Sequence, residues 1–137
     1  MKAQITFPIL FNHFFIEKEK PILYILRLVE EKYYVGKTTN LVSRMKQHMN
    51  GKGAVFTKLY PPIELVYSKR VENIFDEDLL TKEMMMKFGI ENVRGGSYSQ
   101  IYLDQCKQSV LQTEFMTALD LCYHCGNKLH FGSSCSK

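Results

Sequence analysis

The segment from residue 21 to residue 36 limits the possible folds of this chain more than any other. A run of strand-forming residues, 22–28, is followed by the charged stretch 29–32 and then by a second short run, 33–36. Apolar and aromatic runs on both sides of a short polar segment are typical of an antiparallel hairpin. Thr38, Thr39 and Asn40 then offer caps for a helix from about Leu41 to Met49, so a hairpin followed by a helix is predicted.

The rest of the chain predicts one more strand and two more helices. These are a strand at residues 63–67 and helices at about 76–88 and 103–121. The segments 51–62 and 92–99 are rich in Gly, Pro and Ser and are expected to be loops. The order β-β-α-β-α-α predicts an α+β fold, in which helices flank a small three-stranded antiparallel sheet.

The length and composition fit one compact domain with a short appendage. Of the 137 residues, 45% are hydrophobic, which is enough for a core. There is no run of about 18 apolar residues, so no membrane span is expected. Residues 1–20 are expected to form an N-terminal arm or accessory strand. Pro8, Asn12 and His13 interrupt their apolar run, which disfavours a secretory signal.

The net charge of +4 is unevenly distributed. Residues 34–70 hold seven cations and one anion, whereas residues 71–92 hold six anions and two cations. A basic face beside an acidic helix suits phosphate binding next to a metal-binding carboxylate. Charge segregation on an ordinary solvated surface would give the same pattern. We expect Lys46, Lys52 and Lys58 to contact nucleic acid.

Four reactive side chains are expected near one end of the sheet. Arg44 and His48 are four residues apart on one helix face, and Tyr24 and Tyr34 come from the two strands of the hairpin. Phosphodiester hydrolysis needs an activated water, a group that neutralises the phosphoryl oxygens, and a metal or acid for the leaving oxygen. A tyrosine, an arginine and a Mg²⁺-binding carboxylate can supply these. Alternatively, the two tyrosines only pack across the strands, and Arg44 is a surface cation.

These residues resemble the motifs of the GIY-YIG nuclease family. Ile22-Leu23-Tyr24 stands where the family has G-I-Y, with the glycine and isoleucine replaced, and Tyr34-Val35-Gly36 stands for Y-I-G. Arg44 matches the family's invariant arginine. Lys37 resembles the lysine of the excision-repair branch.

Further blocks in the same order extend the resemblance over residues 21–98. Residues 47–54 and 62–67 resemble stretches of small bacterial members, and residues 77–98 resemble a branch common in large DNA viruses and protists. The resemblance implies a metal-dependent endonuclease domain over residues 21–100 that uses Mg²⁺ or Mn²⁺ and cuts DNA more readily than RNA.

The resemblance also implies a glutamate that binds the catalytic metal. Glu77 is our choice and Glu83 is its rival, because the residues around each fit a version of the family pattern. The two are six residues apart on a helix and point to different faces, so both cannot bind one metal directly.

The remaining roles are implied in the same way. Tyr24 or Tyr34 activates or orients the attacking water, Arg44 and Lys37 stabilise the charge of the transition state, and His48 is a further catalytic candidate. Which tyrosine is the base is left open. Arg94 is expected to approach a phosphate from the loop 92–99, although Arg94-Gly95-Gly96 could also be only a turn.

The C-terminal residues 122–135 have the spacing of a zinc site. Cys122, Cys125, His130 and Cys135 offer three thiolates and one imidazole for tetrahedral Zn²⁺. The segment resembles a zinc knuckle, in which Tyr123 and Phe131 would stack on unpaired bases. It is too short for a core, so its order should depend on the metal. Residues 101–121 would be a connecting helix.

Three of the four cysteines lie in this motif, and Cys106 stands alone and is expected to be a buried helix residue. This distribution disfavours a secreted disulfide framework and favours an intracellular protein of the cytoplasm or nucleus, or one encoded by a virus. The sequence therefore predicts a DNA endonuclease with a zinc knuckle that assists nucleic-acid binding. The alternatives are a DNA- or RNA-binding protein without catalytic turnover, and a module whose knuckle binds a protein partner.

Overall fold

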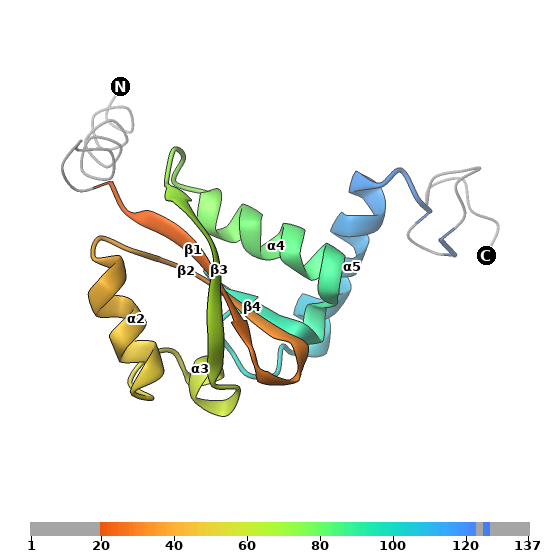
Figure 1. Ribbon diagram of the computed structural model, residues 1–137. Coiled ribbons are helices and arrows are strands. Elements are labelled where there is room, and N and C mark those ends of the chain that lie inside the picture. Colours follow the sequence, from red (N-terminus) through yellow and green to blue (C-terminus); the bar gives the residue numbers. More distant parts are fainter. Residues whose placement is uncertain (1–19, 123–124, 127–137) are drawn as a thin grey trace, which may run out of the picture. The chain divides into compact units, whose positions relative to one another are not determined.

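The computed structural model describes residues 20–122, 125 and 126 (Figure 1). The predicted arm at residues 1–20 lies outside this part except for Lys20, and so does most of the predicted knuckle. The chain divides into two compact units, Met1–Ile101 and Tyr102–Lys137.

The predicted hairpin is confirmed. Strand β1 (Ile22–Leu28) pairs antiparallel with β2 (Lys32–Thr38), and Tyr24 lies opposite Gly36. The turn between them, η2 (Val29–Glu31), places Glu30 and Glu31 at φ of 61° and 57°. The charged residues that interrupt the apolar pattern therefore form the reversal of the chain.

The described part of the first unit holds a four-stranded mixed sheet of order β3-β1-β2-β4. Strand β3 (Pro62–Arg70) pairs antiparallel with β1, and β4 (Val93–Gly95) pairs parallel with β2. The prediction of three antiparallel strands was therefore wrong by one strand. The missed strand, β4, pairs with β2 because of Gly95, where a Cβ atom would come within 2.3 Å of the Val35 carbonyl oxygen. In the sequence this glycine indicated a loop, whereas in the structure it allows two strands to approach closely.

The helices of this unit lie on opposite faces of the sheet (Figure 1). Helices α2 (Leu41–Met49) and α3 (Val55–Leu59) cover one face, where Tyr24, Leu26, Leu28 and Phe56 form a buried cluster. Helix α4 (Asp76–Phe88) covers the other face, and the Phe88 ring stacks on Tyr33. Because side chains alternate along a strand, Tyr33 faces α4 while Tyr34 faces α2.

The predicted helices 41–49 and 76–88 are confirmed, and α2 begins at the Asn40 cap, whose side chain accepts a hydrogen bond from the Ser43 amide. Helix α3 lies in a predicted loop, because five residues are too few to show a periodic pattern. Between α4 and β4 lies one turn, η3 (Ile90–Asn92).

In the second unit, α5 (Gln105–Ala118) begins at Asp104, whose side chain accepts a hydrogen bond from the Lys107 amide. The helix is shorter at both ends than predicted. Cys106 is exposed, contrary to the expectation of a buried residue. In the described residues, no helix is both long and apolar enough to cross a membrane.

Candidate active site

Four of the predicted side chains meet between the β1–β2 hairpin and α2. The Tyr24 hydroxyl lies 2.7 Å from Nε2 of His48, and Nε of Arg44 donates to the same hydroxyl at 3.4 Å. The Tyr34 ring lies 5.3 Å from the imidazole and 6.3 Å from the Tyr24 ring, between centroids. Two strands and one helix therefore hold two phenols, a guanidinium and an imidazole together.

Gly36 allows the two tyrosines to approach each other. A Cβ atom at this position would lie 2.4 Å from the Tyr24 hydroxyl and 2.9 Å from Cε2 of Tyr34. Contacts this short do not occur, so any larger residue would displace a phenol. The Tyr34-Val35-Gly36 motif thus has a steric reason as well as a chemical one.

Glu77 approaches this cluster from the first turn of α4. Its carboxylate lies 3.8 Å from Nζ of Lys37, which follows Gly36 on β2. Burial raises the pKa of Glu77, and the charge of Lys37 opposes that rise. Burial also raises the pKa of Tyr34, and the negative charge of Glu77 adds to this effect. The negative charge of Glu77 acts on both tyrosines, whereas Glu83 lies six residues further along the helix and is exposed.

The loop after β4 is fixed to the same end of α4. The Asp78 carboxylate accepts hydrogen bonds from the amide of Ser97, at 2.8 Å, and from its hydroxyl. A Cβ atom on Gly96 would collide with that carboxylate, and the Gly96 amide hydrogen-bonds to Glu77. The loop therefore lies directly beside the Glu77 carboxylate.

The protonation states of Tyr24 and His48 are set mainly by burial. His48 is 1% exposed, and its burial together with the charge of Arg44 lowers its pKa from 6.5 to about 4. Burial raises the pKa of Tyr24 to about 12. At neutral pH the phenol is therefore protonated and the imidazole is neutral.

Comparison with known proteins places this cluster in a family. Residues 20–78 match the family model described as the GIY-YIG catalytic domain. The chain is 34% identical over 71 residues to a UPF0213 protein of Streptococcus pyogenes, an alignment that covers 50% of this chain and 73% of that relative. The chain belongs to the GIY-YIG family.

Two further relatives of this GIY-YIG chain are also UPF0213 proteins. A UPF0213 protein of Clostridium perfringens is 45% identical over 51 residues, covering 37% of this chain and 55% of the relative. The UPF0213 protein YazA of Bacillus subtilis is 36% identical over 58 residues, covering 42% and 50%. The chain spans about half to two thirds of the length of several relatives that it matches. No solved structure matches.

The pKa of His48 makes the stability of the GIY-YIG domain depend on pH. Between pH 6.5 and 4 the unfolded chain binds a proton at His48 that the folded chain does not, so the free energy of unfolding falls as the pH falls. The lowered pKa corresponds to about 3 kcal/mol over this interval. We expect urea denaturation at pH 6.5 and pH 4 to show this loss in the wild type and a smaller one in His48→Gln. Equal losses would contradict the assigned pKa.

Arg94 is not available for the predicted phosphate contact. It is 3% exposed, and its guanidinium donates to the backbone carbonyls of Ile90, Val93, Gln100 and Ile101. A guanidinium that is buried and hydrogen-bonded in this way stabilises the chain around β4. We therefore assign Arg94 a structural role within the GIY-YIG domain in place of phosphate binding.

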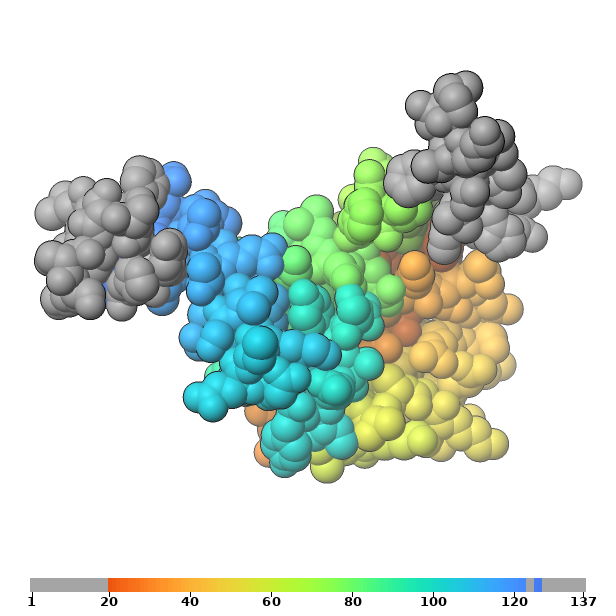
Figure 2. Space-filling view, turned by 180° about the vertical axis from the view of Figure 1, so that it is seen from behind, coloured from red at the N-terminus to blue at the C-terminus, as the bar shows by residue number. Residues whose placement is uncertain are grey.

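The three lysines predicted to bind nucleic acid are exposed on the side of the GIY-YIG domain formed by α2 and α3. Lys46 lies on α2, Lys52 follows it, and Lys58 lies on α3. Figure 2 shows the surface of this part of the chain as one continuous area, light orange to yellow.

The start of the predicted knuckle lies within the described residues. The Gly126 amide donates to the Cys122 carbonyl at 2.6 Å, and Gly126 has a φ of 77°. Glycine adopts this φ without strain, so Gly126 allows a tight turn directly after Cys125. His130, Cys135, Tyr123 and Phe131 lie outside the described residues.

Some residues of the GIY-YIG site carry no signal in the sequence. Thr57 on α3 lies 3.0 Å from Nδ1 of His48, and a Cβ atom on Gly53 would come within 2.2 Å of the same nitrogen. A single Thr and a single Gly in a segment without periodicity are not distinguishable from ordinary loop residues. Asp78 could have been found, because it follows Glu77 in an acidic helix start that faces a Gly-rich loop.

Proposed function

We propose that this protein is a metal-dependent endonuclease that hydrolyses phosphodiester bonds in DNA. The observation that carries the proposal is the hydrogen-bonded group of Arg44, Tyr24 and His48, which lies beside the Glu77 carboxylate. Membership of the GIY-YIG family, whose members are nucleases, supports it.

Glu77 would hold the catalytic Mg²⁺ or Mn²⁺. Among residues 20–122, 125 and 126, no group of three or more His, Cys, Asp or Glu side chains comes together as a metal site. A single carboxylate still fits Mg²⁺, which takes one or two protein carboxylates and fills its shell with water and phosphate oxygens. When bound, the ion would polarise the scissile phosphate and stabilise the leaving oxygen.

Tyr24 would be the general base. Its hydroxyl lies within hydrogen-bond distance of a neutral imidazole that can take its proton as the hydroxyl takes a proton from the attacking water. Tyr24 has no exposed surface, so a neighbour must move to admit the water. Arg44 is the partly exposed neighbour, and a turn of its side chain towards a phosphate would open this path. Tyr34, which is only partly buried, would orient the water.

Arg44 and Lys37 would stabilise the charge that develops on the phosphoryl oxygens. Cations held next to a partly buried reaction centre act at low effective dielectric, where charge stabilisation is large. Arg44 is the better placed for this role, because it is partly exposed and lies against the Tyr24 hydroxyl, the base of the proposed step.

The substrate would be bound outside the reaction centre as well. The exposed Lys46, Lys52 and Lys58 would contact phosphates, and the knuckle with Tyr123 and Phe131 would bind unpaired bases. This combination suits branched, flapped or single-stranded DNA. The resemblance to the branch of large DNA viruses and protists suggests a role in repair, recombination or genome processing, within the cytoplasm or nucleus of a cell.

The test is a cleavage assay with supercoiled plasmid and with branched and single-stranded oligonucleotides of DNA and RNA. We expect DNA cleavage with Mg²⁺ or Mn²⁺, none with excess EDTA, and a loss of about 10²- to 10³-fold in Arg44→Ala. Arg27→Ala is the matched control, because Arg27 pairs with Glu64 at an exposed position. Tight binding without cleavage of any substrate would sink the nuclease and favour a binding protein.

Zinc removal should affect only the C-terminal segment. A zinc-selective chelator should change the amide NMR signals of residues 122–135 and leave those of residues 21–98 in place, because the segment has too few apolar residues for a core of its own. Mass spectrometry under native conditions should show one zinc ion per chain, which Cys125→Ser should lose. Unfolding of the whole chain on chelation would contradict this assignment.

A further inference from the structure

The hydrogen bond that Thr57 donates to Ala54 gives the hydrogen bonds around His48 a direction. The Thr57 hydroxyl donates its proton to the Ala54 carbonyl at 2.8 Å, and a carbonyl oxygen can only accept. The same hydroxyl oxygen lies 3.0 Å from Nδ1 of His48 and has no second proton to give. In this contact Nδ1 must therefore be the donor and carry the hydrogen.

The hydrogen on Nδ1 of His48 also determines how the imidazole bonds to the Tyr24 hydroxyl. A neutral imidazole carries one hydrogen, so Nε2 is unprotonated and accepts from the Tyr24 hydroxyl at 2.7 Å. The phenol oxygen remains able to accept from Nε of Arg44, which is always a donor. One chain thus runs from the guanidinium through the phenol, imidazole and hydroxyl to a backbone carbonyl.

Close packing holds the His48 imidazole in this orientation. His48 is 1% exposed, and the Gly53 backbone is so close that a Cβ atom there would meet Nδ1 and Cε1 at 2.2 and 2.8 Å. The Tyr34 ring also contacts the imidazole, at 5.3 Å between centroids.

We propose that Thr57 is a positioning residue that fixes His48 in the tautomer with hydrogen on Nδ1, so that Nε2 faces Tyr24 as a proton acceptor. The importance of this for cleavage rests on the function proposed above. In the step itself, the Tyr24 O–H bond breaks and an Nε2–H bond forms, while the phenol oxygen takes the proton of the attacking water. Thr57 touches neither water nor phosphate and acts only through the imidazole.

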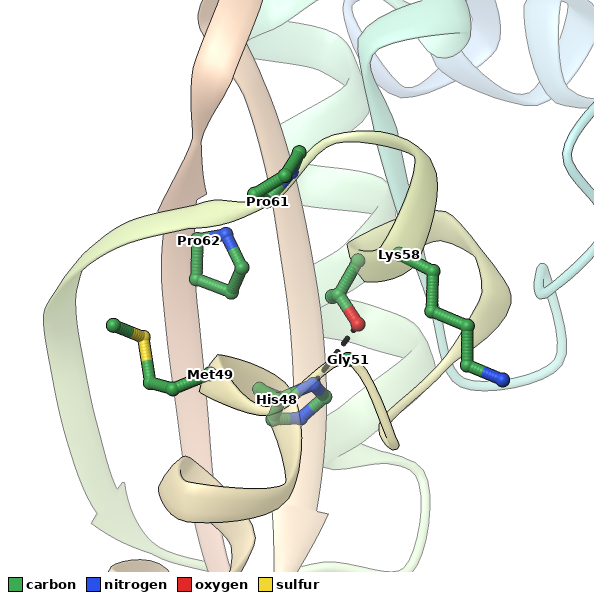
Figure 3. A pocket seen from close by; sticks show the side chains of 7 residues that line it. His48, Met49, Gly51, Lys58, Pro61 and Pro62 are labelled. Atoms are coloured by element: carbon green, nitrogen blue, oxygen red, sulfur yellow. Dashed lines mark hydrogen bonds between the residues drawn. The ribbon is translucent and has the colours of Figure 1, made fainter.

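The surroundings of Thr57 decide which substitution is informative. A pocket of about 340 Å³ opens beside the His48–Thr57 pair, lined also by Met49, Lys58 and Pro61 (Figure 3). In Thr57→Ala a water could enter from this pocket and accept from Nδ1, which would hide the effect. Thr57→Val keeps the branched shape and excludes the water. The Ala54 carbonyl keeps the backbone amides of Thr57 and Lys58 as donors.

The test combines ring ¹⁵N NMR of labelled histidines with cleavage kinetics. The His48 signals are identified among the four histidines by their loss in His48→Gln. We expect hydrogen on Nδ1 in the wild type and in Thr57→Ser. In Thr57→Val we expect hydrogen on Nε2, because a buried N–H without an acceptor is less tolerable than an unpaired lone pair. In the cleavage assay, kcat of Thr57→Val should fall about 10- to 100-fold with KM unchanged, and Thr57→Ser should restore it.

The possible outcomes separate this proposal from the proposed nuclease. Hydrogen on Nε2 in the wild type would overturn the tautomer assignment without any variant, so the test survives if Thr57→Val does not fold. A switched tautomer in Thr57→Val with unchanged kcat would overturn the positioning role. The expected tautomers in a protein that cuts no nucleic acid would support the role of Thr57 and sink the nuclease.

Discussion

Glu77→Gln is expected to lose at least about 10³-fold of the metal-dependent cleavage rate. The amide keeps the size of the carboxylate but has no charge to hold a divalent cation, and Mg²⁺ depends on a carboxylate where the protein offers so few ligands. The change also removes the negative charge beside Lys37. The measurement is single-turnover cleavage of labelled DNA over a range of Mg²⁺ and Mn²⁺ concentrations.

Glu83→Gln is the matched control, since it makes the same substitution on the same helix at an exposed position. We expect its cleavage rate to stay within about twofold of the wild type, because surface substitutions away from a site have small effects. Loss of cleavage in Glu83→Gln with normal cleavage in Glu77→Gln would move the metal to the other carboxylate.

Tyr24→Phe is expected to lower the cleavage rate by about 10²- to 10⁴-fold, the range that a positioned acid–base group contributes. The substitution removes only the hydroxyl that joins His48 to Arg44. Substrate binding, measured by fluorescence anisotropy without metal, should not change, because the hydroxyl is buried.

The same substitution at Tyr34 and Tyr33 should have much smaller effects on the cleavage rate than Tyr24→Phe. Tyr34→Phe should lower the cleavage rate about tenfold, which is the effect of losing one hydrogen bond that orients a water. Tyr33→Phe should have no effect on the rate, because Tyr33 lies on the opposite face of the sheet and stacks on Phe88. A larger loss in Tyr34→Phe than in Tyr24→Phe would make Tyr34 the base.

The parts of the fold that follow from local pattern could be predicted from the sequence. The hairpin has strand-forming runs around a charged turn, α2 begins at the Asn40 cap and α4 ends at Gly89. These signals depend only on residues near one another in the chain. The motif residues Tyr24, Tyr34, Arg44 and His48 could be grouped for the same reason, since a hairpin and one following helix fix their places.

The parts that depend on contacts between distant segments could not. Strand β4 has only three residues and exists because Gly95 fits against Val35. The burial of Arg94 follows from the positions of four carbonyls, and no property of its neighbours in sequence indicates it. The contact between Thr57 and His48 arises from a five-residue helix that has no pattern of its own.

The carbonyl partners of Arg94 determine where the GIY-YIG domain can be separated from the rest of the chain. The resemblance in sequence ends at Tyr98, yet two of the four acceptors belong to Gln100 and Ile101. A protein shortened after residue 98 would lose two of the four carbonyl acceptors of this guanidinium, which we expect to destabilise the chain around β4. A chain that ends a few residues beyond Ile101 would retain them all. The end of the folded GIY-YIG domain is thus set by Arg94, which hydrogen-bonds to residues beyond the end of the resemblance.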